Sequence, residues 1–176
     1  MTLIVCGLAD LPGLVAARRP SHVVTLLSPE SMIETPEGIH AERHLRIGIN
    51  DIAEPMDGMV CPDESVVERL IAFGETWDEA SPMIVHCWAG ISRSTASAFT
   101  LACARNPQID ETAIARTMRR LAPHAYPNRR IIALADDMLG RGGRMVDAVE
   151  AMGASSFVSM GVPFDFPPRH LSLIHI

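Results

Sequence analysis

The sequence predicts an α/β fold in which a central, largely parallel sheet of about four to five strands is flanked by helices. Short apolar segments typical of buried strands alternate with longer segments of helical periodicity. The chain has 176 residues and 48% hydrophobic composition, which suffices for one domain with a sizeable core. In addition, the apolar run at residues 83–85 leads into a short glycine-containing loop and a helix start, an arrangement common in such folds.

The individual elements follow from apolar periodicity and from turn residues. We assign residues 1–156 to a single domain and residues 157–176 to a C-terminal tail that is partly irregular, because the tail contains several prolines and no clear period. One helix is expected to begin directly after Asn128, with apolar residues at helical spacing through Leu139. The other expected strands are 2–7, 22–27, 44–49 and 83–85, and the other expected helices are 9–18, 62–77, 92–104, 109–121 and 145–152.

Composition excludes several classes of function. The formal net charge is −6, and a general nucleic-acid partner or an anionic membrane would require a basic surface, so we expect neither. All 15 basic residues are arginine. The absence of lysine excludes Schiff-base chemistry and a Walker-type phosphate loop.

The four cysteines indicate a reducing compartment. They form no CxxC pair and no spacing typical of a zinc site or a disulfide framework. The N-terminal apolar run lacks a basic segment before it and does not resemble a signal peptide. We therefore expect a cytoplasmic protein that uses neither a metal nor another cofactor. The abundance of Ala and Arg with no Lys suggests a high-GC, bacterial source.

Residues 82–94 predict an anion-binding site with a nucleophile. They correspond to a buried strand, a tight loop and the first turn of a helix, so loop N–H groups and a helix N-terminus point to one place. Five residues separate Cys87 from Arg93. A thiolate is favoured beside a guanidinium and a helix N-terminus, and the planar guanidinium can bind two oxygens of a phosphate. The pattern predicts a nucleophile in a phosphate-binding loop.

The run HCWAGISRS resembles the signature loop of the cysteine-dependent protein tyrosine phosphatases, His-Cys-x5-Arg-Ser/Thr. Its AGISRS portion is most similar to the dual-specificity branch. The resemblance covers roughly residues 45–139, and the chain lacks the long insertions of the tyrosine-specific enzymes. It implies a compact, metal-independent phosphate monoester hydrolase that forms a phosphocysteine. The substrate would be a phosphotyrosine protein or peptide, with phosphoserine and phosphothreonine left open.

The resemblance also implies roles for single residues. Cys87 would be the nucleophile and Arg93 the phosphate-binding cation. Ser94 would hydrogen-bond the leaving thiolate when water breaks the intermediate, with a plain helix cap as the alternative. His86 and Asn128 would support the loop. The remaining loop residues would bind the phosphate or line the pocket: Trp88, Ala89, Gly90, Ile91 and Ser92. Trp88 is equally compatible with packing on a neighbouring loop.

A leaving group that departs as an alkoxide or phenoxide needs a proton donor, which a carboxylic acid above the pocket can supply. Asp51 directly follows a predicted strand and resembles the family's general acid in context and in its distance from Cys87. Asp57, beside a glycine, is the second candidate. Asp63 is the third, although it fits the start of a helix better.

Two other functions remain open. A phosphoinositide or RNA 5′-phosphate phosphatase would use the same loop, but lipid-directed members carry basic residues inside it, whereas the residues between Cys87 and Arg93 are uncharged. A phosphate-binding adaptor without turnover usually lacks the nucleophile or the acid, and this chain has candidates for both. The oligomeric state is not predicted.

Overall fold

The structure, a computed structural model, describes residues 1–171. Strands and helices alternate through the first half of the chain, and helices dominate the second half. The strands are β1 (Leu3–Gly7), β2 (His22–Leu27), β3 (His44–Gly48), β4 (Met83–Cys87) and β5 (Phe164–Phe166). The α-helices are α1 (Leu11–Arg18), α2 (Glu64–Thr76), α3 (Arg93–Arg105), α4 (Glu111–Leu121), α5 (Arg129–Met138) and α6 (Arg144–Glu150), and short 3-10 turns lie at Leu8–Asp10, Pro29–Ser31 and Ala41–Arg43.

The strands form one sheet in the order β3-β2-β4-β1-β5. The pairs β2·β3, β2·β4 and β1·β4 are parallel, and β5 runs antiparallel to β1. This confirms the predicted α/β class with a largely parallel sheet. Because β1 to β4 are parallel, their carboxyl ends lie at one edge of the sheet, where ligands bind in folds of this class.

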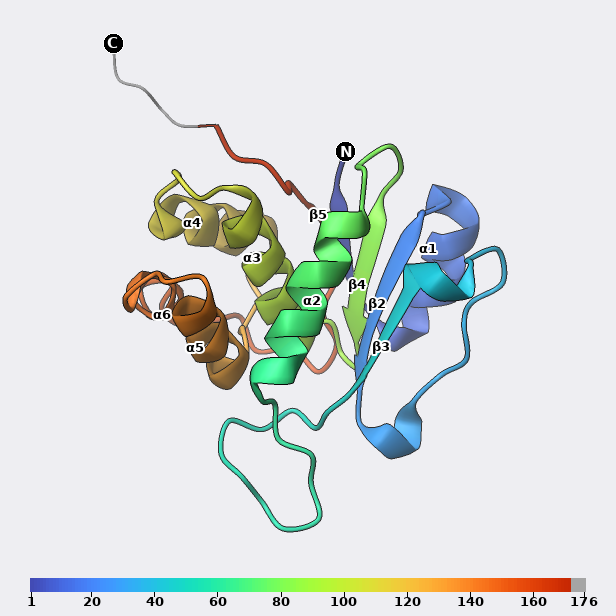
Figure 1. The fold of residues 1–176 in the computed structure, drawn as a ribbon, viewed down its shortest axis with the longest axis horizontal. Coiled ribbons are helices and arrows are strands. Elements are labelled where there is room, and N and C mark those ends of the chain that lie inside the picture. Colours follow the sequence, from blue (N-terminus) through green and yellow to red (C-terminus); the bar gives the residue numbers. More distant parts are fainter. Residues whose placement is uncertain (172–176) are drawn as a thin grey trace.

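Helices cover the two faces of the sheet unequally (Figure 1). Helix α1 packs on one face, over a small apolar cluster that contains Ile4, Cys6, Leu11, Val23 and Ile84. The helices from α2 onward lie on the other face and enclose the main core. Figure 1 also shows the loop between β3 and α2 projecting at the end of the sheet to which the β4 arrowhead points.

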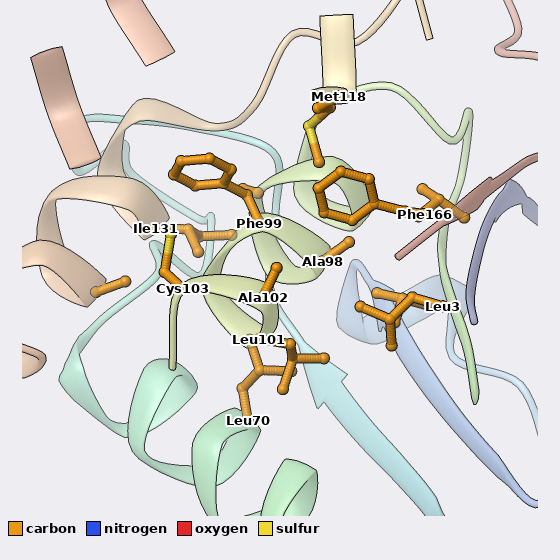
Figure 2. Close-up of a cluster of buried hydrophobic side chains, with 14 of the residues drawn as sticks. Leu3, Leu70, Ala98, Phe99, Leu101, Ala102, Cys103, Met118, Ile131 and Phe166 are labelled. Carbon is orange, nitrogen blue, oxygen red and sulfur yellow. The ribbon is translucent and has the colours of Figure 1, made fainter. Parts of the chain in front are cut away.

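Helix α3 is the centre of the main core (Figure 2). Its residues Arg93 through Cys103 are all buried, because small side chains allow the sheet and the helices α2, α4 and α5 to approach it from all sides. Gly74 of α2 illustrates how close this packing is. A Cβ at position 74 would lie 2.6 Å from the Leu101 side chain.

The segment after α6 is part of the fold up to His170, whose N–H donates to Asn106 Oδ1, although most of it falls in the region that we expected to be a partly irregular tail. Residues 151–163 contain no helix or strand, and the short strand β5 then pairs with the free edge of β1. A three-residue strand next to prolines gives no periodic signal, and it exists here because β1 offers it hydrogen-bonding partners. Residues 172–176 of the expected tail lie outside the described residues.

Within residues 1–171, no helix has the length and apolar character that crossing a membrane requires.

Candidate active site

The signature loop, residues 87–93, connects β4 to α3 and holds its carbonyl groups outward. Four of these carbonyls accept hydrogen bonds from backbone N–H groups of surrounding segments: Trp88 from Leu8 at 3.0 Å, Ala89 from Gly161 at 2.8 Å, Ile91 from Tyr126 at 2.9 Å and Ser92 from Asn128 at 3.2 Å. In a tight loop, carbonyls that point outward leave the N–H groups facing the concave side. That side is therefore suited to an anion.

Gly90 allows the loop to lie against the end of β1. Its φ of +74° is in the left-handed region, which favours glycine. A Cβ at this position would lie 2.7 Å from backbone atoms of Cys6 and Gly7. No side chain fits there, so the close approach of the loop to β1 requires glycine.

Cys87 lies at the base of the loop and is almost completely buried. Its Sγ accepts a hydrogen bond from the Gly90 N–H at 3.3 Å and lies 3.2 Å from Ser94 Oγ, in the first turn of α3. The Gly90 N–H, the Ser94 hydroxyl and the N-terminus of α3 thus surround the sulfur.

Arg93 is buried with an incompletely paired guanidinium. Its Nη1 donates to the Ile49 carbonyl at 2.8 Å, directly after β3. Its Nε has no hydrogen-bond partner among the described residues. Buried donors are almost always paired, so a buried cation with a free N–H is prepared for an anionic ligand. The guanidinium is anchored on one side and keeps donors available on the other.

Asp51 is fixed at the rim of the loop through one of its two carboxylate oxygens. Its Oδ1 accepts hydrogen bonds from Ser92 Oγ at 2.7 Å and Asn128 Nδ2 at 2.9 Å. Its Oδ2 accepts none from the described residues. The amide oxygen of Asn128 in turn accepts from the Arg130 and Ile131 N–H groups and caps helix α5. Asn128 therefore connects the Asp51 side chain, the signature loop and helix α5.

The other two carboxylates considered as general acids lie elsewhere. Asp57 is exposed, in the turn closed by the hydrogen bond from Met59 N–H to the Met56 carbonyl. Asp63 accepts hydrogen bonds from the N–H and hydroxyl groups of Ser65 and caps helix α2. Neither residue lines the pocket above Cys87.

That pocket has a volume of about 620 Å³ and is open to solvent above the sulfur. Two half-exposed aromatic side chains, Trp88 and Tyr126, form part of its wall. Its lining residues are Asp51, Ala53, Cys87, Trp88, Ala89, Ile91, Ser92, Arg93, Tyr126, Pro127, Asn128 and Arg129. No three His, Cys, Asp or Glu side chains of residues 1–171 gather as metal ligands.

His86 lies behind the loop and does not line the pocket. Its Nδ1 is 3.3 Å from the Cys87 carbonyl and its Nε2 is 2.7 Å from Thr25 Oγ1. Burial is the main cause that lowers the pKa of His86 to about 4. The imidazole is therefore neutral near pH 7, and its position fits the supporting role implied by the resemblance.

Solved structures share this architecture. The structure of DUSP15 matches with a TM-score of 0.62 at 19% identity, covering 85% of this chain and 89% of that one. PTPMT1 in complex with PI(5)P matches with a TM-score of 0.60 at 13% identity, covering 87% and 95% of the two chains. The human tyrosine phosphatase-like serine/threonine/tyrosine-interacting protein matches with a TM-score of 0.55 at 16% identity, covering 80% and 92%. The fold is that of the dual-specificity phosphatases.

No protein-family model matches the sequence, and no curated protein sequence matches it. The solved structures thus confirm the predicted fold.

Sequence reasoning missed part of the pocket of this dual-specificity phosphatase fold. Tyr126, Pro127 and Arg129 line it through the turn before α5, and Ala53 lines it from the loop after β3. The Tyr126-Pro127-Asn128 run was a usable signal, because a loop-supporting Asn brings its neighbours to the same rim. Ala53 carries no chemical signal, and only the folded loop places it there.

Proposed function

We propose that this protein is a metal-independent phosphate monoester hydrolase of the dual-specificity branch of the cysteine-dependent phosphatases. One observation carries the proposal. The Cys87 sulfur, the Arg93 guanidinium and the Asp51 carboxylate line the same pocket, and both charged groups keep atoms without protein partners. A nucleophile, a cation for the phosphate and a proton donor are the parts that this reaction requires.

In the first step, the Cys87 thiolate attacks phosphorus in line with the bond to the leaving oxygen. The Arg93 guanidinium and the loop N–H groups bind the phosphoryl oxygens and stabilise their charge. Protonated Asp51 donates its proton to the leaving oxygen, and its Oδ2 suits this role because Oδ1 is already hydrogen-bonded. The products of this step are an alcohol or phenol and a phosphocysteine.

In the second step, water attacks the phosphocysteine. Asp51, now a carboxylate, takes a proton from the water and is ready for the next turnover. The sulfur leaves as a thiolate, and Ser94 Oγ at 3.2 Å can donate a hydrogen bond to it. Inorganic phosphate then leaves the loop.

The wall of the pocket supports a phosphotyrosine substrate in a protein or peptide. Trp88 and Tyr126 present about half of their surface, and aromatic faces favour stacking with an aromatic leaving group. Phosphoserine and phosphothreonine are smaller, and they reach the same sulfur without using these rings. We therefore rank them below phosphotyrosine as substrates.

Hydrolysis of p-nitrophenyl phosphate by the wild type and by Cys87→Ser tests the proposal. We expect turnover in EDTA for the wild type and none above background for the variant. Cys61→Ser is the matched control, since Cys61 is a partly exposed thiol outside the pocket, and it should retain activity. Equal activity of Cys87→Ser and wild type would overturn the proposal. Tight phosphate binding without turnover would instead indicate a phosphate-binding adaptor.

A phosphoinositide is the second candidate substrate. PTPMT1, which shares the fold, was solved in complex with PI(5)P. In this chain, Arg129 lines the pocket and forms no ion pair with the described residues, so it is available for a further phosphate. A panel of phosphotyrosine, phosphoserine and phosphothreonine peptides, PI(5)P and 5′-phosphorylated RNA separates the candidates. We expect the highest kcat/KM for the phosphotyrosine peptide. A higher kcat/KM for PI(5)P would instead identify a phosphoinositide as the substrate.

A further inference from the structure

A chain of polar side chains crosses the sheet directly behind the signature loop. His86 on β4, Thr25 on β2 and His44 on β3 are buried, and Thr35, in the loop before β3, is partly exposed. The distances are 2.7 Å from His86 Nε2 to Thr25 Oγ1, 2.8 Å from Thr25 Oγ1 to His44 Nε2 and 3.1 Å from His44 Nδ1 to Thr35 Oγ1. At the loop end, His86 Nδ1 lies 3.3 Å from the Cys87 carbonyl.

Both imidazoles are neutral, so each carries one ring proton. Burial is the main cause that lowers the pKa of each histidine to about 4. The charged and titratable groups near His86 are Arg93 and His44, which both act in the same direction as burial. Near His44, Arg46 also lowers the pKa and Glu34 opposes it weakly.

The Cys87 carbonyl determines where every proton in this chain lies. A carbonyl only accepts, so His86 must hold its proton on Nδ1 and leave Nε2 bare. Thr25 then donates to His86 Nε2, and its oxygen accepts from His44 Nε2–H. The Nδ1 of His44 is consequently bare and accepts from the Thr35 hydroxyl. The two histidines are opposite tautomers, and all four hydrogen bonds run in one direction.

We propose that Thr25 and His44 are positioning residues that hold His86 in the Nδ1–H tautomer and thereby orient the Cys87 carbonyl. A strand places successive side chains on opposite faces, so His86 points away from the Cys87 sulfur and acts on it only through the backbone. The His86 Nδ1–H holds the carbonyl of the first peptide of the loop. The signature loop thereby keeps the orientation in which its N–H groups face the anion. Without Thr25, the commoner Nε2–H tautomer would put a bare Nδ1 against the carbonyl.

The tautomers can be read directly from long-range ¹H–¹⁵N correlation spectra of the wild-type protein, which distinguish protonated from bare ring nitrogens. The expected result is Nδ1–H for His86 and Nε2–H for His44 at pH 7. The same tautomer on both histidines, or a doubly protonated imidazole on either, would overturn the proposal. This measurement does not depend on the proposed function. The tautomer proposal can therefore fail while the proposed function holds, and the reverse is also possible.

Substitution of Thr25 tests the effect on the loop. Thr25→Val removes the hydroxyl at constant shape, Thr25→Ser keeps it, and Thr100→Val is the matched control because its buried hydroxyl bonds only within α3. The readout is the rate of Cys87 alkylation by iodoacetamide at pH 6 divided by that at pH 9. We expect Thr25→Val to lower this ratio about tenfold and to shift His86 to Nε2–H. Thr25→Ser and Thr100→Val should match wild type.

An unchanged ratio in folded Thr25→Val would contradict the proposal, and so would an equal loss in Thr100→Val. Folding of each variant is checked by circular dichroism. If Thr25→Val does not fold, the proposal is tested by the histidine tautomers of the wild type and of Thr25→Ser. The alkylation readout requires a reactive Cys87 but no turnover, so it also remains informative if the protein proves to be a phosphate-binding adaptor.

Discussion

Two of the segments that line the pocket are loops that are held in different ways. Four carbonyls of the signature loop accept backbone hydrogen bonds from Leu8 directly after β1, from the segment before β5 and from the turn before α5. The acid loop, residues 50–62, is closed at its neck by backbone and side-chain hydrogen bonds between Asn50 and Val60, and its middle is exposed. Its described contact with the signature loop is the Asp51 side chain itself, bonded to Ser92.

This difference fits the two proposed tasks, which are phosphate binding by the signature loop and proton transfer by the acid loop. The group that binds phosphate must be pre-organised, because its N–H groups stabilise charge only if they do not have to reorient during the reaction. The carboxylic acid that transfers a proton needs only one oxygen close to the leaving oxygen of the substrate. The substrate must also enter and leave the pocket past this acid. The structure therefore uses many buried hydrogen bonds for the first loop and few for the second. The following predictions test this contrast, from the largest effect to the smallest.

The largest effect should come from the acid loop when the leaving group is poor. Asp51→Asn removes the proposed proton donor while keeping the shape of the side chain and an oxygen that accepts the bonds from Ser92 and Asn128. We expect kcat for phenyl phosphate or a phosphotyrosine peptide to fall about 10²- to 10⁴-fold, the usual contribution of general acid catalysis. The loss for p-nitrophenyl phosphate should be smaller, because nitrophenolate departs without protonation.

Asp57→Asn is the control on the same loop, and its kcat should equal that of wild type because Asp57 is exposed and outside the pocket. A loss in Asp57→Asn that equals or exceeds the loss in Asp51→Asn would reverse the assignment of the acid.

A pair of glycines compares the rigidity of the two loops directly. Gly90 and Gly58 have nearly the same φ, +74° and +76°. At Gly90 a Cβ would lie 2.7 Å from β1 backbone, whereas at Gly58 it would meet nothing within 4 Å. Gly58→Ala should cost only backbone strain, about 1 kcal/mol in the free energy of unfolding. Gly90→Ala should cost about 3 kcal/mol or more and abolish phosphate binding. Equal costs in urea denaturation would show that the signature loop is not closely packed on β1.

Acid should destabilise the structure behind the signature loop. The pKa values of His86 and His44 are lowered to about 4 from an ordinary value of 6.5, so the folded protein binds fewer protons than the unfolded chain between these pH values. The free energy of unfolding should therefore fall as pH decreases from about 6.5 to 4, by up to about 3 kcal/mol for each histidine. His44→Gln should reduce this pH dependence, measured by urea denaturation. An identical pH profile in the variant would contradict the assignment.

Asn128 should show a smaller, mixed effect, because it both caps α5 and holds Asp51. Asn128→Ala should lower the free energy of unfolding by about 1 kcal/mol and kcat about tenfold. Asp110→Ala is the matched control, since Asp110 caps α4 through the Thr112 N–H and lies outside the pocket. It should reproduce the loss of stability and leave kcat unchanged. A kcat loss of the same size in both variants would mean that Asn128 acts only through stability.

The sequence predicts the main sheet, the helices and the signature loop better than it predicts β5 and the polar contacts of the acid loop. The alternation of apolar strands and periodic helices gave the sheet and its helices to within a few residues, since burial imposes regular patterns. The signature loop was recognisable because its chemistry needs particular residues at fixed spacing. By contrast, β5 was missed because three residues carry no period, and its strand pairing depends on the distant β1.

The polar interactions that complete the site are also non-local. Nothing in the sequence places Ser92 and Asn128 on the same oxygen of Asp51, residues that are 41 and 77 positions away from it. Likewise, Thr25 lies 61 positions from His86, and each looks like an ordinary strand residue until the sheet brings them together. Such contacts follow from topology, which residue patterns specify only in outline.

The most direct test of the central claim is to look for phosphate on Cys87. Ser94→Ala removes the hydroxyl that we propose to assist the leaving thiolate, so breakdown of the proposed intermediate should slow and the phosphocysteine should accumulate. Mass spectrometry of this variant, quenched with acid during turnover, should find phosphate on the peptide that contains Cys87. Continued hydrolysis with that peptide unmodified, or with phosphate on another residue, would contradict the account.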